Sequence, residues 1–196
     1  MFGKFIVFEG IDGAGKTTQV QLLCERFAPR QSRVRLVQDG IKARPFKANS
    51  GSTLVDTLTA RTIDSYSIKS YLEKGITVIC DRWDWSTLVY QRDELRNSVN
   101  QEIYRNSYSL APDLYVYLDI EVDRALSRIK NPDKFETKEN LIECLRIYRH
   151  LTELDSIRVP YQILSQNGSL DAETIHKNIV WFVNEKLFQI SLPVAY

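Results

Sequence analysis

The residues best suited to chemistry lie at 10–17, Gly-Ile-Asp-Gly-Ala-Gly-Lys-Thr. Their spacing matches the phosphate-loop pattern, in which two glycines with four residues between them precede lysine and then serine or threonine. Glycines let the backbone turn so that successive N–H groups face a polyphosphate at a helix start. Lys16 has the reach for the β- and γ-phosphates, and the Thr17 hydroxyl suits Mg²⁺. The residues expected to hold the triphosphate are Gly10, Ile11, Asp12, Gly13, Ala14, Gly15, Lys16, Thr17 and Thr18.

A second set of charged residues follows two apolar runs further along the chain. Residues 76–80 (Ile-Thr-Val-Ile-Cys) are typical of a strand buried on both faces, and Asp81 and Arg82 come directly after them. Residues 114–118 end in the same way at Asp119. Ligands of a parallel sheet bind at the carboxyl ends of its strands. We therefore expect Arg82 to bridge two phosphates and Asp81 to hold Mg²⁺ through water. The alternatives are a structural Arg82 that pairs with Asp81 or with a helix end, and an Asp81 that is an ordinary carboxylate at a strand end.

The elements that must position these residues alternate between strand and helix. Such alternation predicts right-handed parallel crossovers and a three-layer α/β domain of the P-loop NTPase type, with a central parallel five-stranded sheet flanked by helices. The polar stretch 38–53 is expected to be a loop. Strands are expected at 5–8, 33–37, 76–80, 114–118 and 161–164, and helices at 17–28, 54–74, 84–94, 99–109, 121–129, 138–157 and 170–188.

Composition narrows the function classes. The 196 residues, 43% hydrophobic and 26% charged, suit one domain spanning 1–196. A net charge of +1 gives no general field for long nucleic acid and no polybasic membrane anchor. No apolar run approaches membrane-spanning length, and the first strand begins too early for a signal peptide. Three cysteines without C-x-x-C spacing indicate reduced thiols, so we expect a cytoplasmic protein without a membrane partner.

Several segments together resemble the thymidylate kinase family. The opening 5–19 is similar to the family's first strand and phosphate loop, and 81–91 (Asp-Arg-Trp-Asp-Trp-Ser-Thr-Leu-Val-Tyr-Gln) is similar to its D-R-Y-x-x-S-x-x-A-Y-Q segment. Residues 111–119 resemble its P-D-L…Y-L-D strand, and 133–136 the end of its lid. The resemblance covers most of the chain except 38–60. It implies transfer of the γ-phosphoryl group of magnesium ATP to a deoxypyrimidine monophosphate, dTMP first of all.

The resemblance also assigns roles near the transferred phosphate. Two polyanions must be brought in line and their repulsion cancelled, so catalysis depends on positioning and on cations. Asp12 is expected either to face the acceptor's 3′-hydroxyl or to cap the helix. A short lid is expected at 129–137, where one of Arg128, Lys130 and Lys134 closes over the transferring group, unless these form only a solvated basic turn. Arg128 is alternatively expected to stack on adenine.

The acceptor site shows two departures from the family. The family's usual acceptor-phosphate arginine segment is absent after the second strand, and Arg44 or Lys42 is the candidate substitute. Arg61 falls where the family has an arginine that binds the pyrimidine edge, but Thr57 stands where a stacking phenylalanine is common. Losing an aromatic face loosens or redirects base choice. The other expected nucleoside contacts are Ser86, Tyr90, Gln91 and Phe135, each of which also has a capping or packing alternative.

Other functions stay open from sequence alone. A monophosphate kinase acting on dUMP or a 5-substituted dUMP is one, and a deoxynucleoside kinase using Glu9 or Asp12 as base is another. A nucleotide-binding module without turnover is the non-enzyme alternative. A GTPase is disfavoured because residues 131–134 (Asn-Pro-Asp-Lys) do not form the N-K-x-D motif that reads guanine. The family resemblance also implies a homodimer, for which the apolar-rich stretches 54–74 and 84–110 are the candidates.

Overall fold

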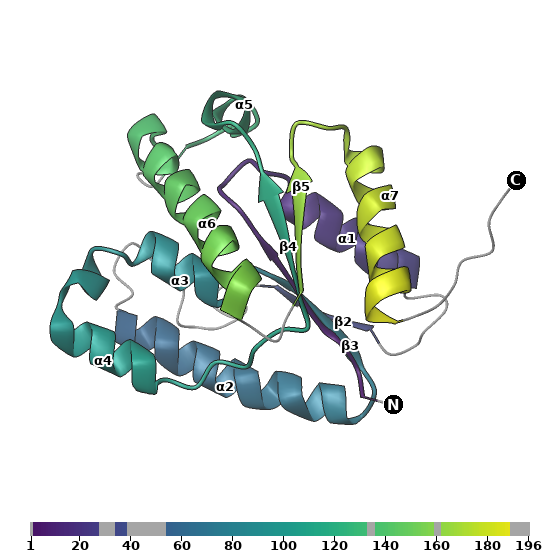
Figure 1. Ribbon diagram of the computed structural model, residues 1–196, viewed down its shortest axis with the longest axis horizontal. Coiled ribbons are helices and arrows are strands. Elements are labelled where there is room, and N and C mark those ends of the chain that lie inside the picture. Colours follow the sequence, from purple (N-terminus) through teal and green to yellow (C-terminus); the bar gives the residue numbers. More distant parts are fainter. Residues whose placement is uncertain (1, 28–33, 39–53, 133–135, 159–161, 189–196) are drawn as a thin grey trace, which may run out of the picture.

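A parallel sheet forms the centre of the protein. The computed structural model describes residues 2–27, 34–38, 54–132, 136–158 and 162–188 (Figure 1). Within them, the sheet has the strand order β2-β3-β1-β4-β5, and each neighbouring pair is parallel. The parallel α/β class expected from sequence is confirmed. The strands are β1 (Phe5–Glu9), β2 (Val34–Gln38), β3 (Thr77–Asp81), β4 (Leu114–Asp119) and β5 (Gln162–Asn167).

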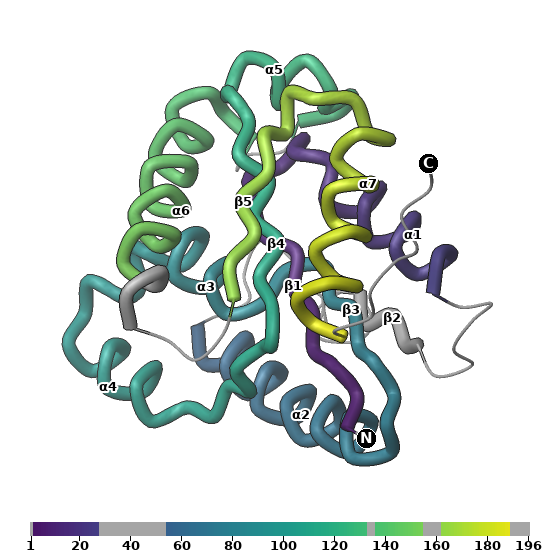
Figure 2. The backbone as a smooth tube through the Cα atoms, turned by 45° about the vertical axis from the view of Figure 1, so that its right-hand side comes forward, coloured from purple at the N-terminus to yellow at the C-terminus, as the bar shows by residue number. Residues whose placement is uncertain are grey.

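Helices cover both faces of this sheet. Figure 1 shows α1 and α7 together on one side and α2, α3 and α6 on the other, which is the expected three-layer arrangement. In the rotated view of Figure 2, α5 lies at the carboxyl ends of the strands, at the top of the molecule. The helices are α1 (Lys16–Phe27), α2 (Leu54–Glu73), α3 (Asp84–Tyr90), α4 (Ser98–Asn106), α5 (Val122–Leu126), α6 (Lys138–Arg158) and α7 (Ala172–Phe182).

The central strand β1 is buried along its whole length, as its continuous apolar run predicts. On one side of it β3 pairs Phe8 with Asp81, and on the other β4 pairs Glu9 with Tyr117. The loop that follows β1 therefore lies between the ends of its two neighbours. This register brings the phosphate loop next to Asp81 and Arg82, as the sequence predicts.

Four expected helices end several residues earlier than predicted: those over 99–109 and 121–129 end at Asn106 and Leu126, and two others show how the chain continues. The helix expected over 84–94 stops at Tyr90 and gives way to a 3₁₀ turn at Glu94–Arg96. The Arg92 guanidinium donates to the Val89 carbonyl at 2.8 Å, so this carbonyl near the helix end has a side-chain donor. The helix expected over 170–188 runs from Ala172 to Phe182 and continues as a π turn, Val183–Leu187.

Candidate active site

The phosphate loop is built around glycines with positive φ. Gly10, Gly13 and Gly15 have φ of 143°, 78° and 93°. A Cβ on Gly13 would lie 2.3 Å from the Ala125 carbonyl oxygen, because the loop packs directly on the end of α5. A larger residue at position 13 would therefore have to displace backbone as well as adopt a strained φ. In this chain the cations of the site must come from other positions.

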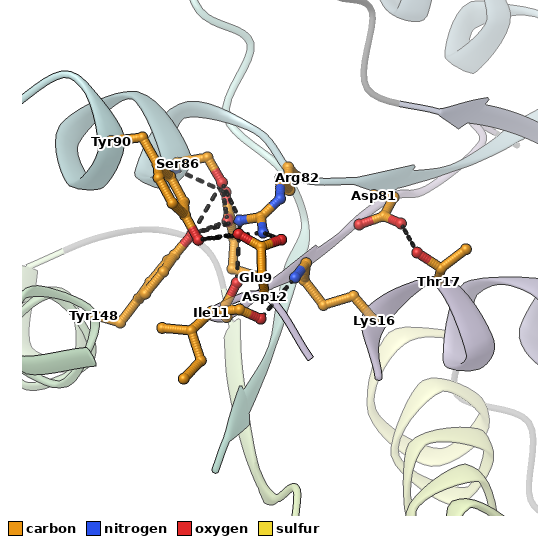
Figure 3. Close-up of polar contacts among 11 residues, drawn as sticks. Glu9, Ile11, Asp12, Lys16, Thr17, Asp81, Arg82, Ser86, Tyr90 and Tyr148 are labelled. Atoms are coloured by element: carbon orange, nitrogen blue, oxygen red, sulfur yellow. Dashed lines mark hydrogen bonds and ion pairs between the residues drawn. The ribbon is translucent and has the colours of Figure 1, made fainter. Parts of the chain in front are cut away.

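Lys16 is buried at the start of α1. Its Nζ donates to the Ile11 carbonyl at 2.9 Å, so the side chain folds back across the loop (Figure 3). Burial, and then the neighbouring Arg82 charge, lower the pKa of Lys16 to about 8. The Asp12 and Asp81 charges oppose this effect only in part, and a phosphate anion entering the loop would add further opposite charge.

Thr17 and Asp81 connect the first turn of α1 to the end of β3. The Thr17 hydroxyl donates to Asp81 Oδ2 at 2.6 Å, which leaves the hydroxyl lone pairs free to face the loop. Among the described residues there is no cluster of three or more His, Cys, Asp or Glu side chains that could hold a metal ion. Two protein oxygens suit Mg²⁺, which commonly keeps water and nucleotide phosphates as its remaining ligands. The pair fits the magnesium role expected for Thr17 and Asp81.

Arg82 extends from the end of β3 to the phosphate loop. Its φ is 73°, unusual for a non-glycine residue, and its backbone N–H donates to the Phe8 carbonyl at 2.9 Å. Its guanidinium donates from Nη1 to the Gly10 carbonyl at 3.1 Å and from Nη2 to Asp12 Oδ1 at 2.5 Å. The guanidinium also lies 4.8 Å from the centre of the Tyr90 ring. The backbone turn therefore directs this cation at the loop, where the sequence predicts it.

Asp12 is the carboxylate that balances these cations. Burial alone would raise its pKa, but the Arg82 and Lys16 charges overcome this effect and lower the pKa to about 2. The Tyr90 hydroxyl donates to its Oδ2 at 3.0 Å. Asp12 is therefore an anion in the free protein, and its contacts make it more than a helix cap.

Glu9, the last residue of β1, is a second, fully buried carboxylate of the site. Its carboxylate accepts from the Trp83 and Ser86 N–H groups at 2.8 and 3.2 Å, and from the Ser86 and Tyr148 hydroxyls at 2.7 and 2.9 Å. Burial raises the pKa of Glu9 above its ordinary value, although the Ser86 hydrogen bond and the Arg82 charge partly oppose this effect. Four donors occupy the four lone-pair positions of an ionised carboxylate. Glu9 is thus fully engaged in holding the segment after β3, which leaves no lone pair for a substrate hydroxyl.

This structural role of Glu9 was not predicted from the sequence. The sequence did indicate it, because a glutamate at the end of a wholly apolar strand must be paired to be buried. Its partner Tyr148 was also missed. Tyr148 lies on α6, and a tyrosine at an apolar position of a helix is interpreted as a packing residue when only the sequence is known.

Arg128 is exposed and joins two loops. Its Nη1 donates to the Gly13 carbonyl and its Nη2 to the Gly168 carbonyl, both at 3.2 Å. It therefore lies between the phosphate loop and the turn after β5, which favours the adenine-side alternative over lid closure. Lys130 is exposed. Of the other predicted site residues, Arg44, Lys134 and Phe135, like the substitute candidate Lys42, lie outside the described residues.

The predicted acceptor residues gather where α2 meets α3. The buried Arg61 donates from Nη2 to the Trp83 carbonyl at 3.0 Å and lies 5.4 Å from the Trp83 ring centre. Its Nε and Nη1 are buried without a hydrogen-bond partner among the described residues. The Gln91 amide donates to the Thr57 hydroxyl at 2.8 Å. Polar groups thus line the position where the sequence predicts the acceptor base.

The fold and the loop together define a P-loop phosphotransferase-type domain, with a second cationic site beside the phosphate loop. Comparisons with known proteins then identify the family. The family model described as "Thymidylate kinase" matches residues 49–179. A relative named "Probable thymidylate kinase" from Pyrococcus horikoshii is 31% identical, with 95% of this chain and 98% of the relative covered. The chain therefore belongs to the thymidylate kinase family, as its motifs predict.

Two further comparisons also cover nearly the whole chain. The "Probable thymidylate kinase" of Methanocaldococcus jannaschii is 31% identical over 91% of this chain and 95% of the relative. A crystal structure of thymidylate kinase from Ehrlichia chaffeensis matches with a TM-score of 0.70 and 21% identity. It covers 93% of this chain and 100% of that chain, so the resemblance of fold extends over the whole domain.

Proposed function

We propose that this protein transfers the γ-phosphoryl group of ATP to the 5′-phosphate of dTMP, giving dTDP and ADP. The observation that carries the proposal is the Arg82 guanidinium, held against Gly10 and Asp12 at the edge of the phosphate loop. A cation in this place can contact the transferred group and the acceptor phosphate together. The names of the relatives supply the choice of dTMP.

Different residues would bind the phosphate donor and the phosphate acceptor. The loop N–H groups and Lys16 would hold the triphosphate, and the acceptor phosphate would take over the Nη2 edge of Arg82 that Asp12 now occupies. The Asp12 carboxylate would then be free to accept a hydrogen bond from the acceptor sugar. Mg²⁺ held near Thr17 and Asp81 would neutralise charge on the β- and γ-phosphates. Arg61 and Gln91 would face the base.

The engagement of Glu9 argues against the deoxynucleoside kinase alternative. Such an enzyme must take a proton from a neutral hydroxyl, and all four lone-pair positions of Glu9 already accept hydrogen bonds. Asp12 has a pKa of about 2, which makes it a weak base. A phosphate acceptor needs no strong base, because its oxygen is already anionic.

A coupled ADP-release assay tests the proposal. The panel should contain dTMP, dUMP, 5-substituted dUMP, the other common monophosphates and thymidine, each with ATP and Mg²⁺. We expect dTMP to give the highest kcat/KM, and Lys16→Ala and Arg82→Ala each to lose at least about a hundredfold. ATP binding without ADP formation from any acceptor would refute the proposal and favour a binding module.

We also propose that the protein is a cytoplasmic homodimer formed through α2 and α4. The two helices border a groove of about 540 Å³ lined by apolar side chains that include Val55, Ile63, Val99 and Ile103. Val99 and Ile63 are 63% and 53% exposed. Exposed apolar side chains that gather in one patch mark an interaction surface, whereas single ones need no explanation.

No helix among the described residues has the length and apolar character to cross a membrane. All three cysteines are free thiols, which supports a reducing compartment.

A further inference from the structure

Tyr148 lies in the interior and was not among the predicted site residues, yet its hydroxyl reaches the centre of the site. The residue is fully buried on α6, and its ring lies 5.8 Å from that of Tyr117. Its hydroxyl oxygen is 2.9 Å from Glu9 Oε2, 2.9 Å from Ser86 Oγ and 3.2 Å from Arg82 Nη1. Figure 3 shows this hydroxyl pointing into the cluster around Arg82.

The direction of these hydrogen bonds follows from the groups involved. Arginine can only donate and an ionised carboxylate can only accept. The Tyr148 oxygen must therefore accept from Arg82, and its own proton is donated to Glu9, as is that of the Ser86 hydroxyl. Since Glu9 is itself fixed by the Trp83 and Ser86 N–H groups, the hydroxyl connects an immobile anion to the guanidinium.

The two edges of Arg82 have different surroundings. The Nη1 edge meets Gly10, Ser86 and Tyr148, all of them neutral acceptors within 3.2 Å. The Nη2 edge meets Asp12 and the Tyr90 hydroxyl, and Asp12 is the group that an incoming phosphate can replace. The first edge is thus held by the protein, and the second is available for exchange.

We propose that Tyr148 is a positioning residue for Arg82, whose hydroxyl fixes the Nη1 edge so that the Nη2 edge is presented to the acceptor phosphate. The proposal rests on the proposed function for the identity of that phosphate. It also gives α6 a role in the reaction, because this helix carries the hydroxyl. Removing the hydroxyl while keeping the ring separates this role from packing.

The test is Tyr148→Phe, with Tyr117→Phe as the matched control for losing a buried tyrosine hydroxyl. We expect Tyr148→Phe to lower kcat/KM for dTMP by about tenfold or more, since hydrogen bonds to charged groups are the stronger ones. The dissociation constant of ATP, measured by calorimetry, should stay within twofold. The control should stay within twofold in both measurements. A loss of under twofold, or an equal loss of ATP binding, would overturn the proposal.

A double-variant cycle then separates positioning from a general structural effect. In an Arg82→Lys background the Nη1 edge no longer exists, so adding Tyr148→Phe should cost less than twofold further. A full tenfold loss in that background would overturn the proposal. A crystal structure of Tyr148→Phe should show Arg82 moved away from Gly10, and an unmoved Arg82 would also overturn it. This structural result decides the matter even if the wild-type protein fails to phosphorylate dTMP, which would refute only the proposed function.

Discussion

Asp12 and Arg82 form an ion pair of 2.5 Å between the loop after β1 and the end of β3. Both side chains are largely buried, at 32% and 15% exposure, so water screens the pair only partly. In the free protein the pair keeps the guanidinium compensated and in place. Under the proposed function, substrate binding would exchange one anion for another at Arg82 and would not create a new cationic site.

The pair should make folding stability depend on pH. The pKa of Asp12 is about 2 when folded and 3.8 ordinarily, so its contribution is present above pH 3.8 and is lost as pH falls toward 2. We expect about 1–2 kcal/mol of unfolding free energy from it, discounted for partial exposure. Urea unfolding of wild type and Asp12→Asn should differ most near pH 6 and converge only at about pH 2 and below. For the exposed Asp123→Asn control, a flat difference is expected.

Lys16 should impose an upper pH limit on donor use. Its pKa of about 8 means that the free protein loses this positive charge as pH rises above 8. Since kcat/KM reports groups of the free enzyme, kcat/KM for ATP should fall about tenfold per pH unit well above that value. Profiles from pH 6 to 9.5 at saturating dTMP measure this. A profile flat to pH 9.5 would show that Lys16 keeps its proton.

Magnesium dependence should change when the Thr17 hydroxyl is removed. Thr17→Val keeps the shape but leaves Asp81 without its 2.6 Å donor and the metal without a ligand oxygen. We expect the Mg²⁺ concentration for half-maximal activity to rise about tenfold, and Thr17→Ser to restore it because serine retains the hydroxyl. An unchanged Mg²⁺ titration for Thr17→Val would place the metal elsewhere.

Arg128 should act on the donor and not on the chemical step. It joins the Gly13 and Gly168 carbonyls, so its loss should loosen the donor side of the site. Arg128→Ala is expected to raise KM for ATP about fivefold to tenfold, with kcat within about threefold of wild type. Steady-state kinetics with each substrate varied will measure the two constants. If kcat falls a hundredfold with KM unchanged, Arg128 is instead the cation that closes over the transferring phosphoryl group.

The oligomeric state should respond to charge in the α2–α4 groove. Ile103 is 37% exposed there, and Ile103→Glu would bury a carboxylate if this face joins two copies. We expect a dimer for the wild type by light scattering and a monomer for Ile103→Glu. Leu154→Glu, a change at an exposed leucine on α6, is the control that should remain dimeric. A wild-type monomer at micromolar concentration would refute the dimer.

Sequence reasoning was most successful where a short local pattern determines the structure. The apolar run before Gly10 and the run before Asp81 predict buried parallel strands, and parallel strands bring their ends together. This logic correctly placed Arg82 beside the phosphate loop. The family was identified from the same stretches.

The remaining site contacts depend on side chains that are distant in the chain. Tyr148 is 139 residues from Glu9, and no local periodicity links them. The end of α3 at Tyr90 was also missed, and there too a side chain, that of Arg92, donates to a backbone carbonyl near the helix end. Partners of this kind are set by packing, which a residue pattern does not encode. The roles of Thr57, Arg61 and Gln91 toward a base stay predictions.

The direct pairing of β1 with β3 sets a fixed scale for the reaction. The phosphate loop follows β1 and Arg82 follows β3, so the two segments start one interstrand step apart in a hydrogen-bonded sheet. Moving them apart would mean breaking the sheet. Under the proposed function, the distance between donor and acceptor phosphates would therefore be set when the sheet folds, and an acceptor shorter by one phosphate would leave a gap that movement of the flanking helices could not close.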